Sequence, residues 1–449
     1  MSAEETAAPR QTLSFFDGVV MVVGMVVGIG IFVTPSLVAQ FAGNGLNYLA
    51  LWLAGGLLAL NGALCYAELA TRFPSAGGEY NFLARAYGKN LALLFAWARC
   101  SVIQTGSIAL VAFVYGDYAQ SLLPLGEFGA ALHAAIIIVI FTTINMAGTF
   151  QGALAQKIFT SMDMTALLLL VAAGCVLILG APPASPPAPA SPSGGGGMIG
   201  LAVVFVMLTY GGWNESAYLS AELKNGKRSM VRVLVISILL VTMLYFAVAF
   251  VYLKAMGFEG LTKSSAIAAD VMRAAFGPTG AAAIAIFVCG SAISTLNATI
   301  FTGGRIYYAL GRDLPWLAKF GRWDAAGENP AKAFLLQGAV ALALVLLSIF
   351  IGENGFRTMV DYTAPVFWLF MTLIGISLFL FRHRGEGEAE GYCVPFYPVT
   401  PLIFVATCLY MLWSSVDYVR EGSLAGLAVL LAGVPLLFFR SGAKASPVE

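Results

Sequence analysis

Long apolar segments separated by short polar connections run through almost the whole chain. Each reaches about 20 residues, the length that an α-helix needs to cross the hydrocarbon core of a bilayer. The pattern predicts an all-α integral membrane protein with about twelve transmembrane spans. They are expected at 15–38, 46–70, 91–122, 130–148, 158–180, 198–221, 231–256, 279–308, 333–351, 357–381, 398–416 and 423–439.

The first and the sixth span are interrupted by glycine at corresponding places. One break is Gly28-Ile29-Gly30 and the other is Tyr210-Gly211-Gly212-Trp213. Each broken span is the first in a set of five consecutive apolar spans. Backbone groups freed inside a bilayer are tolerable only where they line a cavity or meet a ligand. Because the first span enters from the cytoplasm and the sixth from outside, the two sets of five spans form inverted repeats with both breaks near the midplane.

The two breaks supply complementary partial charges. The second half of span one begins after Gly30, so its free N–H groups should attract a carboxylate. The first halves end in free carbonyls, among them those of Val26 and Leu208, which should accept hydrogen bonds from an ammonium group. An anion site and a cation site that lie close together fit an α-amino acid.

The spans divide the chain into segments, and the basic residues orient it. The predicted segments are a cytoplasmic tail (1–12), a first repeat (13–180), an extracellular linker rich in Pro, Ala, Ser and Gly (181–197), a second repeat (198–384), two further spans (385–440) and a cytoplasmic tail (441–449). Only five of the 24 Lys and Arg fall on or near one face. The positive-inside rule then places both termini in the cytoplasm, with the spans in the plasma (inner) membrane.

Composition agrees with a membrane protein and excludes other classes. Apolar residues make up 59% of the chain and charged residues 10%, against about 45–50% and 25% in soluble domains. No phosphate-binding loop, nucleophile elbow or zinc helix is present, so we expect no enzyme. Two histidines and six unpaired cysteines do not suggest a metal cluster. We expect no cofactor except Na⁺ or H⁺ as a coupling ion, and neither nucleic acid nor an obligatory protein partner.

Four stretches of the chain resemble a known family. They are Val23 to Pro35 (VGMVVGIGIFVTP), Tyr66 to Leu69 followed by Pro74 to Tyr80 (YAEL, PSAGGEY), Tyr210 to Asn214 (YGGWN) and Gly304 to Pro315 (GRIYYALGRDLP). In this order they resemble the amino acid-polyamine-organocation (APC) superfamily, and within it the L-amino-acid transporter-like permeases. The resemblance implies a leucine-transporter-like fold of two inverted five-helix repeats plus two helices, and amino acid uptake or exchange.

The resemblance also implies which residues bind the substrate. The candidates at the two breaks are Met25, Val26, Gly28, Ile29, Gly30, Leu208, Tyr210, Gly211, Gly212, Trp213, Asn214 and Glu215. Ile29 stands where the family often has serine, and Leu208 where many relatives carry a phenylalanine gate. A smaller gate and a more apolar floor suit a neutral substrate, with Tyr210 or another aromatic residue as the replacement gate. Trp213 is either a packing anchor or a ligand contact.

A third departure reverses a charge. Asp163 aligns with a lysine that, in many relatives, resembles a built-in cation standing in for sodium between spans one, five and eight. It lies about seven residues, roughly 10 Å, inside span five, where a charged aspartate costs about 2.5–3.5 kcal/mol. We expect Asp163, carbonyls of the first break, Ser294 and Thr295 to bind a cation or a proton. The alternative is an ion pair with Arg99.

Two glutamates have several interpretations. Glu215 could bind a substrate ammonium, accept a proton or stabilise a half-helix N-terminus, and a cationic substrate becomes more plausible if it faces the cavity. Glu68 is expected to pair with Arg72 or Arg85, either at the inner gate or in solvent.

The sequence favours a secondary carrier for neutral amino acids that works by alternating access. Spans one and six would rock against a scaffold of spans three, four, eight and nine. The coupling could be to sodium, to protons or to exchange. The alternative is a carrier of cationic amino acids or polyamines. A membrane amino acid sensor is a candidate from another class, but the chain offers no soluble signalling domain.

Overall fold

The structure, a computed structural model, is built of α-helices. It describes residues 14–73, 78–147, 153–180, 196–214, 216, 226–313, 318–320, 330–351, 355–386, 392–418 and 420–437. The predicted tails, most of the linker at 181–197 and Glu215 lie outside these ranges. Within them, nine helices are long and apolar enough to cross a membrane, or up to ten if one bent pair counts as a single span.

The bent pair contains the first predicted break. It consists of α1 (Phe15–Val26) and α2 (Gly30–Ala42), whose axes differ by 47°. The remaining helices of the first half are α3 (Gly45–Arg72), α4 (Gly78–Tyr87), α5 (Lys89–Ala98), the π-helical segment η1 (Arg99–Ile103), α6 (Gln104–Leu122), α7 (Gly129–Met146) and α8 (Ala153–Gly180). Hydrophobic periodicity did not reveal α4, which is short and only weakly apolar.

The second half is also a succession of mostly apolar helices. It contains α9 (Gly196–Thr209), α10 (Gly226–Lys263), α11 (Ile267–Asp313), α12 (Ala331–Ile351), α13 (Gly355–Arg384), α14 (Val399–Tyr418), α15 (Arg420–Leu431) and the 3₁₀ turn η4 (Val434–Leu437). The predicted count of twelve exceeds the nine or ten found among the described residues, because α9 and α15 are too short to qualify on their own.

Two glycines explain where two predicted spans stop and start. Gly257 has φ of 67° within α10, and Gly277 has φ of 68° within α11. The predicted spans 231–256 and 279–308 end just before the first and begin just after the second. Backbone with positive φ suits glycine and interrupts a right-handed helix.

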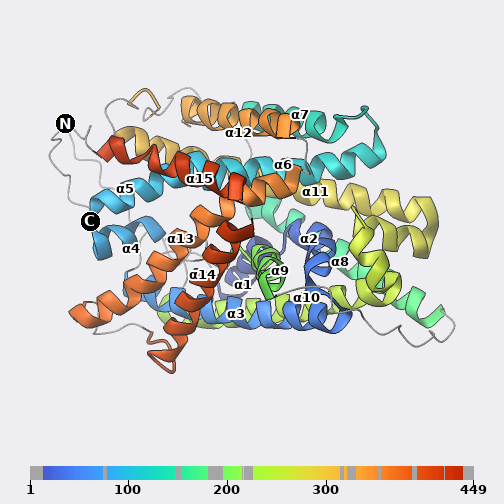
Figure 1. The fold of residues 1–449 in the computed structure, drawn as a ribbon, viewed down its shortest axis with the longest axis horizontal. Helices are drawn as coiled ribbons and strands as arrows, with labels where there is room; N and C mark the ends of the chain where they lie inside the picture. Colours follow the sequence, from blue (N-terminus) through green and yellow to red (C-terminus); the bar gives the residue numbers. More distant parts are fainter. Residues whose placement is uncertain are drawn as a thin grey trace.

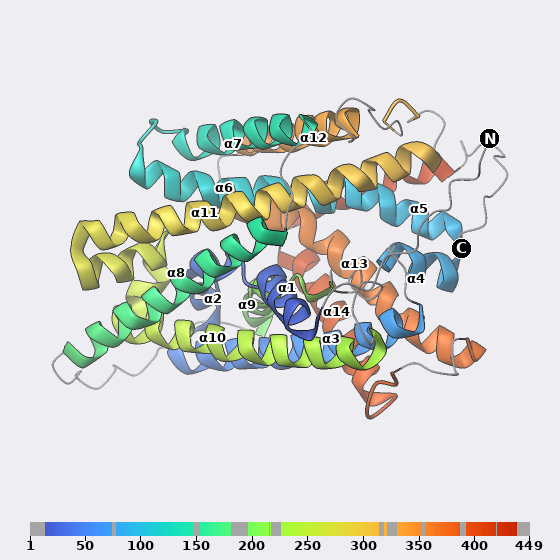
Figure 2. The same cartoon turned by 180° about the vertical axis from the view of Figure 1, so that it is seen from behind.

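The helices pack in two groups. In the first, which we call the broken-helix group, α3 packs on α10, α2 on α9 and α1 on α10. In the second, the layered group, α6 packs on α11 and α7, and α12 packs on α7. Figure 1 shows the layered group above and the broken-helix group below. From behind, α8 is seen crossing between them, in contact with α11, α10 and α1 (Figure 2).

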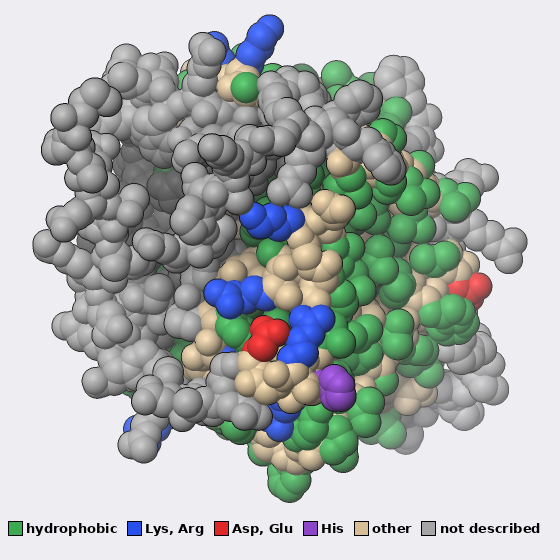
Figure 3. Space-filling view, turned by 90° about the vertical axis from the view of Figure 1, so that its left-hand side faces the viewer, with side chains coloured by type: hydrophobic (Ala, Val, Ile, Leu, Met, Phe, Trp, Pro, Cys, Tyr) green, Lys and Arg blue, Asp and Glu red, His purple; other side chains and the backbone are tan. Residues whose placement is uncertain are grey.

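One end of the molecule is basic. Figure 3 looks at the end where α4, α5 and the last turns of α13 lie, and shows Lys and Arg side chains gathered there. Arg85, Lys89 and Arg384 are exposed at this end. Arg384 donates to the carbonyls of Arg85 and Ala86 at 3.3 and 3.1 Å, so the end of α13 is fastened to α4.

Candidate functional site

The first break begins where the backbone leaves the helical region. Val27 follows α1 with φ of −78° and ψ of 100°, an extended conformation. Ile29 precedes α2 as its N-cap and makes no side-chain hydrogen bond to the helix. An apolar N-cap leaves the first N–H groups of α2 without the partner that Ser, Thr, Asn or Asp would supply. The Phe32 N–H already donates to the Ile29 carbonyl at 3.1 Å, so the N–H groups of Gly30 and Ile31 are the ones suited to bind an anion.

The second break is built around Gly212. The chain leaves α9 at Thr209, and Gly212 takes φ of 96°. A Cβ at this position would lie 2.2 Å from the carbonyl oxygen of Met25, which belongs to α1. Glycine is required here both by the positive φ and by the close approach of the other break.

The two breaks touch along their length. A Cβ on Gly30 would lie 3.1 Å from Cγ2 of Thr209, so α2 begins against the end of α9. The hydroxyls of Thr34 and Thr209 are 2.6 Å apart, and Thr34 Oγ1 also donates to the carbonyl of Gly30 at 2.9 Å. Segments about 180 positions apart in the chain thus form one site.

The prediction that the carbonyls of Val26 and Leu208 have no hydrogen-bond partner is wrong. The Val26 carbonyl accepts a hydrogen bond from the Tyr245 hydroxyl at 2.9 Å. The Leu208 carbonyl accepts one from the N–H of Gly211 at 3.1 Å. Buried carbonyls are generally paired within the protein. Each carbonyl oxygen has a second lone pair, and that is what remains for an ammonium group.

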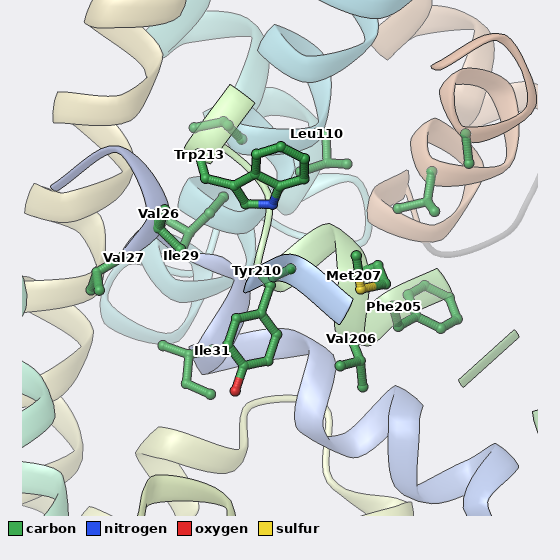
Figure 4. Packing of buried hydrophobic residues seen from close by; sticks show 14 of the residues in the cluster. Val26, Val27, Ile29, Ile31, Leu110, Phe205, Val206, Met207, Tyr210 and Trp213 are labelled. Carbon is green, nitrogen blue, oxygen red and sulfur yellow. The ribbon is translucent and has the colours of Figure 1, made fainter. Parts of the chain in front are cut away.

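The aromatic side chains at the second break point in opposite directions (Figure 4). Tyr210 is buried, donates its hydroxyl to the carbonyl of Trp52 at 3.0 Å and packs against Tyr245. Trp213 is also buried and packs edge-on against Tyr66, with ring centroids 5.1 Å apart. Both rings are held by packing in this conformation, and Val26 and Ile29 are buried in the same apolar cluster.

The remaining candidates at the breaks differ in burial. Met25, Gly28, Gly30, Leu208 and Gly211 are half-buried. Asn214 is buried and donates to the carboxylate of Glu79 at 3.1 Å.

Asp163 lies on α8, which packs against α1, where the first break begins, and against α11. Asp163 is buried on α8, and its Oδ1 has no hydrogen-bond partner among the described residues. Ser291 of α11 lies beside the carboxyl group, and its own hydroxyl is likewise buried without a partner in the described part of the chain. Thr295 Oγ1 would lie 3.8 Å from a Cβ on Gly28. Carboxylate, hydroxyl and backbone oxygens therefore lie in the same region.

The sequence prediction named Ser294 and Thr295 and did not include Ser291. Ser291 lies three residues before Ser294 and four before Thr295, so all three hydroxyls can share one face of α11. The i, i+4 spacing was the available signal. The alternative ion pair between Asp163 and Arg99 is not formed, because Arg99 pairs with Glu79 at 2.9 Å.

Comparison of the sequence with known proteins identifies the family of this chain. A family model described as amino acid permease matches residues 13–424, which include both breaks and Asp163. The chain belongs to this amino acid permease family. The match confirms the resemblance to the APC superfamily drawn from the four sequence stretches.

Individual relatives of this permease are named as amino acid carriers. The b(0,+)-type amino acid transporter 1 of Homo sapiens is 30% identical over 387 residues, covering 85% of this chain and 78% of that protein. The serine/threonine exchanger SteT of Bacillus subtilis (strain 168) is 24% identical over 444 residues, covering 97% and 98%. The large neutral amino acids transporter small subunit 2 of Homo sapiens is 29% identical over 430 residues, covering 93% and 78%. The permease is thus a multi-pass amino acid transporter rather than an enzyme.

Away from the breaks, Glu68 of this permease forms a buried ion cluster. Its carboxylate contacts Arg72 at 2.9 Å, confirming the predicted partner, and it accepts from Arg382 Nε and Nη2 at 2.8 and 2.7 Å. It also accepts from the N–H of Val394 at 2.6 Å. Arg85 lies over the ring of Phe73 instead. The cluster fastens the end of α13 and the chain that follows it to α3.

We expect Tyr245→Phe to reduce transport by about tenfold, because the Tyr245 hydroxyl joins the two breaks. It donates to the Val26 carbonyl at 2.9 Å and approaches the Thr209 carbonyl at 3.4 Å. An unpaired buried carbonyl costs about 1–3 kcal/mol, and here the cost falls on the transport-competent arrangement. Amino acid flux into liposomes measures the effect. Tyr87→Phe is the control, since Tyr87 also donates to a backbone carbonyl, that of Leu373, but away from the breaks. Equal losses in the two variants would contradict the prediction.

Proposed function

We propose that this permease is a secondary active carrier that moves neutral amino acids across the plasma membrane by alternating access. The observation that carries the proposal is the direct contact of the two breaks, Gly212 against Met25 and Gly30 against Thr209. This contact sets the uncapped start of α2 beside the carbonyls that end α1 and α9. The N–H groups bind the substrate carboxylate, and the carbonyls accept from its ammonium group.

The lining of the site favours a neutral side chain. Among the described residues of the two breaks, 25–30 and 208–214, none is charged. Val26, Ile29 and Trp213 provide apolar surface instead. A cationic amino acid or a polyamine needs an available carboxylate. Glu79, which contacts Asn214, is already paired with Arg99, and Asp163 is the proposed coupling residue. These contacts favour the neutral class over the cationic alternative.

The two helix groups are the moving parts of the proposed cycle. The broken-helix group takes α1, α2 and α3 from the first half of the chain and α9 and α10 from the second. The layered group takes α6 and α7 from the first half and α11 and α12 from the second. This matched selection supports two inverted repeats, 13–180 and 198–384, followed by two further spans to give twelve. One group rocks against the other around the fixed site.

The proposed orientation places both termini in the cytoplasm. The basic end of the molecule, with Arg85, Lys89 and Arg384 exposed, lies at the α4 side. In a chain that starts in the cytoplasm, the connection between spans two and three returns to that side. The positive-inside rule supports this assignment.

Asp163 is the proposed coupling residue. Its carboxylate, the hydroxyls of Ser291 and Thr295 and backbone oxygens near Gly28 form a set of hard oxygen ligands, which suits Na⁺. The same carboxylate, buried with Oδ1 unpartnered among the described residues, can instead take up a proton. Either ion would neutralise Asp163 at the moment when the first break binds substrate. Ser294 lies next to Thr295 and is a further candidate ligand.

Transport by the reconstituted permease tests both parts of the proposal. Labelled amino acids and polyamines are offered to proteoliposomes with and without a sodium or proton gradient. We expect gradient-driven accumulation of a neutral amino acid, and Asp163→Asn should reduce it to equilibration while leaving exchange intact. Asp270→Asn is the matched control, since Asp270 forms an ion pair with Arg273 that is partly exposed. Flux that depends on amino acid on the opposite side and ignores both gradients would contradict the coupling role. It would leave an exchanger with a structural Asp163.

A further inference from the structure

A buried carboxylate ties three helices together next to the second break. Glu79 of α4 is 2% exposed. Its Oε1 accepts hydrogen bonds from the Tyr66 hydroxyl at 2.9 Å and from Asn214 Nδ2 at 3.1 Å. Its Oε2 pairs with Arg99 at 2.9 Å. The donors come from α3, from the residues that follow the break after α9, and from η1.

The third span is locally distorted at Arg99. Arg99 begins the π-helical segment η1, where one extra residue is accommodated between α5 and α6. One residue corresponds to about 100° of helical rotation, so the segment changes the direction in which Arg99 projects relative to α6. π-Helical segments of this kind occur often at functional sites.

Two tyrosines hold the carbonyls of this segment. The Tyr362 hydroxyl of α13 donates to the carbonyl of Ser101 at 3.0 Å. The Tyr307 hydroxyl of α11 donates to the carbonyl of Cys100. On the next turn, Gln104 contacts Arg99 at 3.5 Å and donates to the carbonyl of Thr299 in α11 at 2.8 Å. The guanidinium is therefore fixed to the layered group.

The donors to Glu79 belong to different moving parts. Tyr66 and Asn214 lie on the broken-helix group or directly after it, whereas Arg99 is continuous with α6 of the layered group. Relative motion of the two groups must stretch or break the contacts that meet at this carboxylate. A small cavity lies beside it, lined by Glu79, Arg99, Phe95, Phe370, Met371 and Ile374. Its volume of about 10 Å³ is close to that of a single water probe.

We propose that Glu79 is a latch that holds the cytoplasmic side of the carrier closed. The latch connects Asn214, at the second break, to Arg99 of the third span, and inward opening requires Glu79 to release Asn214 and Tyr66. Glu79 acts here as a positioning residue and does not contact the substrate. The inference rests on the proposed alternating-access function, and it adds the contact that keeps one side shut.

A latch and a purely structural ion pair differ in what their loss changes. Loss of a structural pair weakens the whole protein and exposes both ends. Loss of a latch shifts the balance between conformations and exposes one end only, because only the inward-open state gains population. Accessibility measured at both ends therefore separates the two roles.

The experiment measures thiol labelling at both ends of the intact permease in proteoliposomes. The exposed Cys175 and Cys393 are replaced by serine, and Ile374→Cys places a reporter in the wall of the cavity. Native Cys289, beside the carbonyl of Tyr115 near the other end of α6, is the internal reference. Glu79→Gln is compared with Glu127→Gln, the same chemical change at an exposed position.

We expect Glu79→Gln to shift the equilibrium between the closed and the inward-open conformation about tenfold toward the inward-open one. The labelling rate at position 374 should rise by the same factor. Labelling of Cys289 should not rise, and Glu127→Gln should change neither rate. An unchanged rate at position 374, or a parallel rise at Cys289, would overturn the latch. If Glu79→Gln does not accumulate, Tyr66→Phe removes a single donor and should raise the rate about threefold; no rise would overturn the latch equally.

Amino acid flux in the same proteoliposomes distinguishes failure of the latch from failure of the proposed function. A background protein that carries no amino acid contradicts the carrier, whatever the labelling shows. Normal flux with unchanged labelling in Glu79→Gln contradicts only the latch.

Discussion

Gly212→Ala is expected to reduce amino acid transport by roughly 100-fold. The substitution places a methyl group 2.2 Å from the carbonyl oxygen of Met25, closer than any real Cβ contact. It also forces alanine into φ of 96°, a conformation that costs a residue with a Cβ about 1–2 kcal/mol. Neither cost can be relieved by a side-chain rotation, because both involve backbone. The two breaks must move apart, and the carboxylate and ammonium sites separate with them.

The expected loss of flux is roughly 100-fold. A displacement of a bound substrate by about 1 Å lowers the rate of an enzyme reaction by a similar factor. Initial uptake by proteoliposomes, normalised to inserted protein, measures the loss. Gly126→Ala is the matched control, since Gly126 has φ of 88° with nothing within 4 Å of the added Cβ. The control carries the conformational strain without the clash. Flux in Gly212→Ala that stays within a few-fold of the control would show that contact between the breaks is dispensable.

Glu68→Gln should destabilise the folded permease by about 3–5 kcal/mol, the usual cost of removing one partner from a buried ion pair. Glu68 is fully buried and holds Arg72, Arg382 and the N–H of Val394. Glutamine offers a single acceptor oxygen, and its amide group faces the two guanidinium groups as a donor. Arg72, whose side chain is 6% exposed, and the half-buried Arg382 are then left without a neutralising charge.

Thermal unfolding in detergent, followed by size-exclusion chromatography, measures this loss as a lower midpoint. Glu259→Gln is the control, because Glu259 also pairs with a basic residue four positions later, Lys263, at 2.6 Å. That pair is exposed, with 82% of the Glu259 side chain accessible, so solvent screens it and its loss should leave the midpoint unchanged. Equal shifts in both variants would mean that burial does not set the strength of the Glu68 cluster.

The sequence located the breaks but not everything that surrounds them. Glycine pairs in apolar segments are a local signal, and the chain does bend between Val26 and Gly30. The free carbonyl of Val26 was a local inference as well, and it failed because Tyr245, 219 positions away, donates to it. The role of Glu79 had no local signal beyond a glutamate after a glycine pair.

The same contrast applies to the charged residues. Arg72 could be predicted as a partner of Glu68 because four residues bring side chains together on one helix face. Arg382 could not, because it lies 314 positions away. Asp163 was recognised as costly from its depth in an apolar segment, but its neighbour Ser291 is set by the packing of α8 on α11.

The sequence by itself determined that this protein lies in a lipid bilayer. It also determined the approximate position of most helices and the places where a helix had to break. Those features follow from segment length, apolar composition and the conformational freedom of glycine, which act within one turn or one span. Only the tertiary structure decided which groups meet at the breaks: Gly212 with Met25, Asn214 with Glu79, and Asp163 with Ser291. Such pairings depend on the register and crossing of helices packed side by side, and many sequences of equal hydropathy would pack differently.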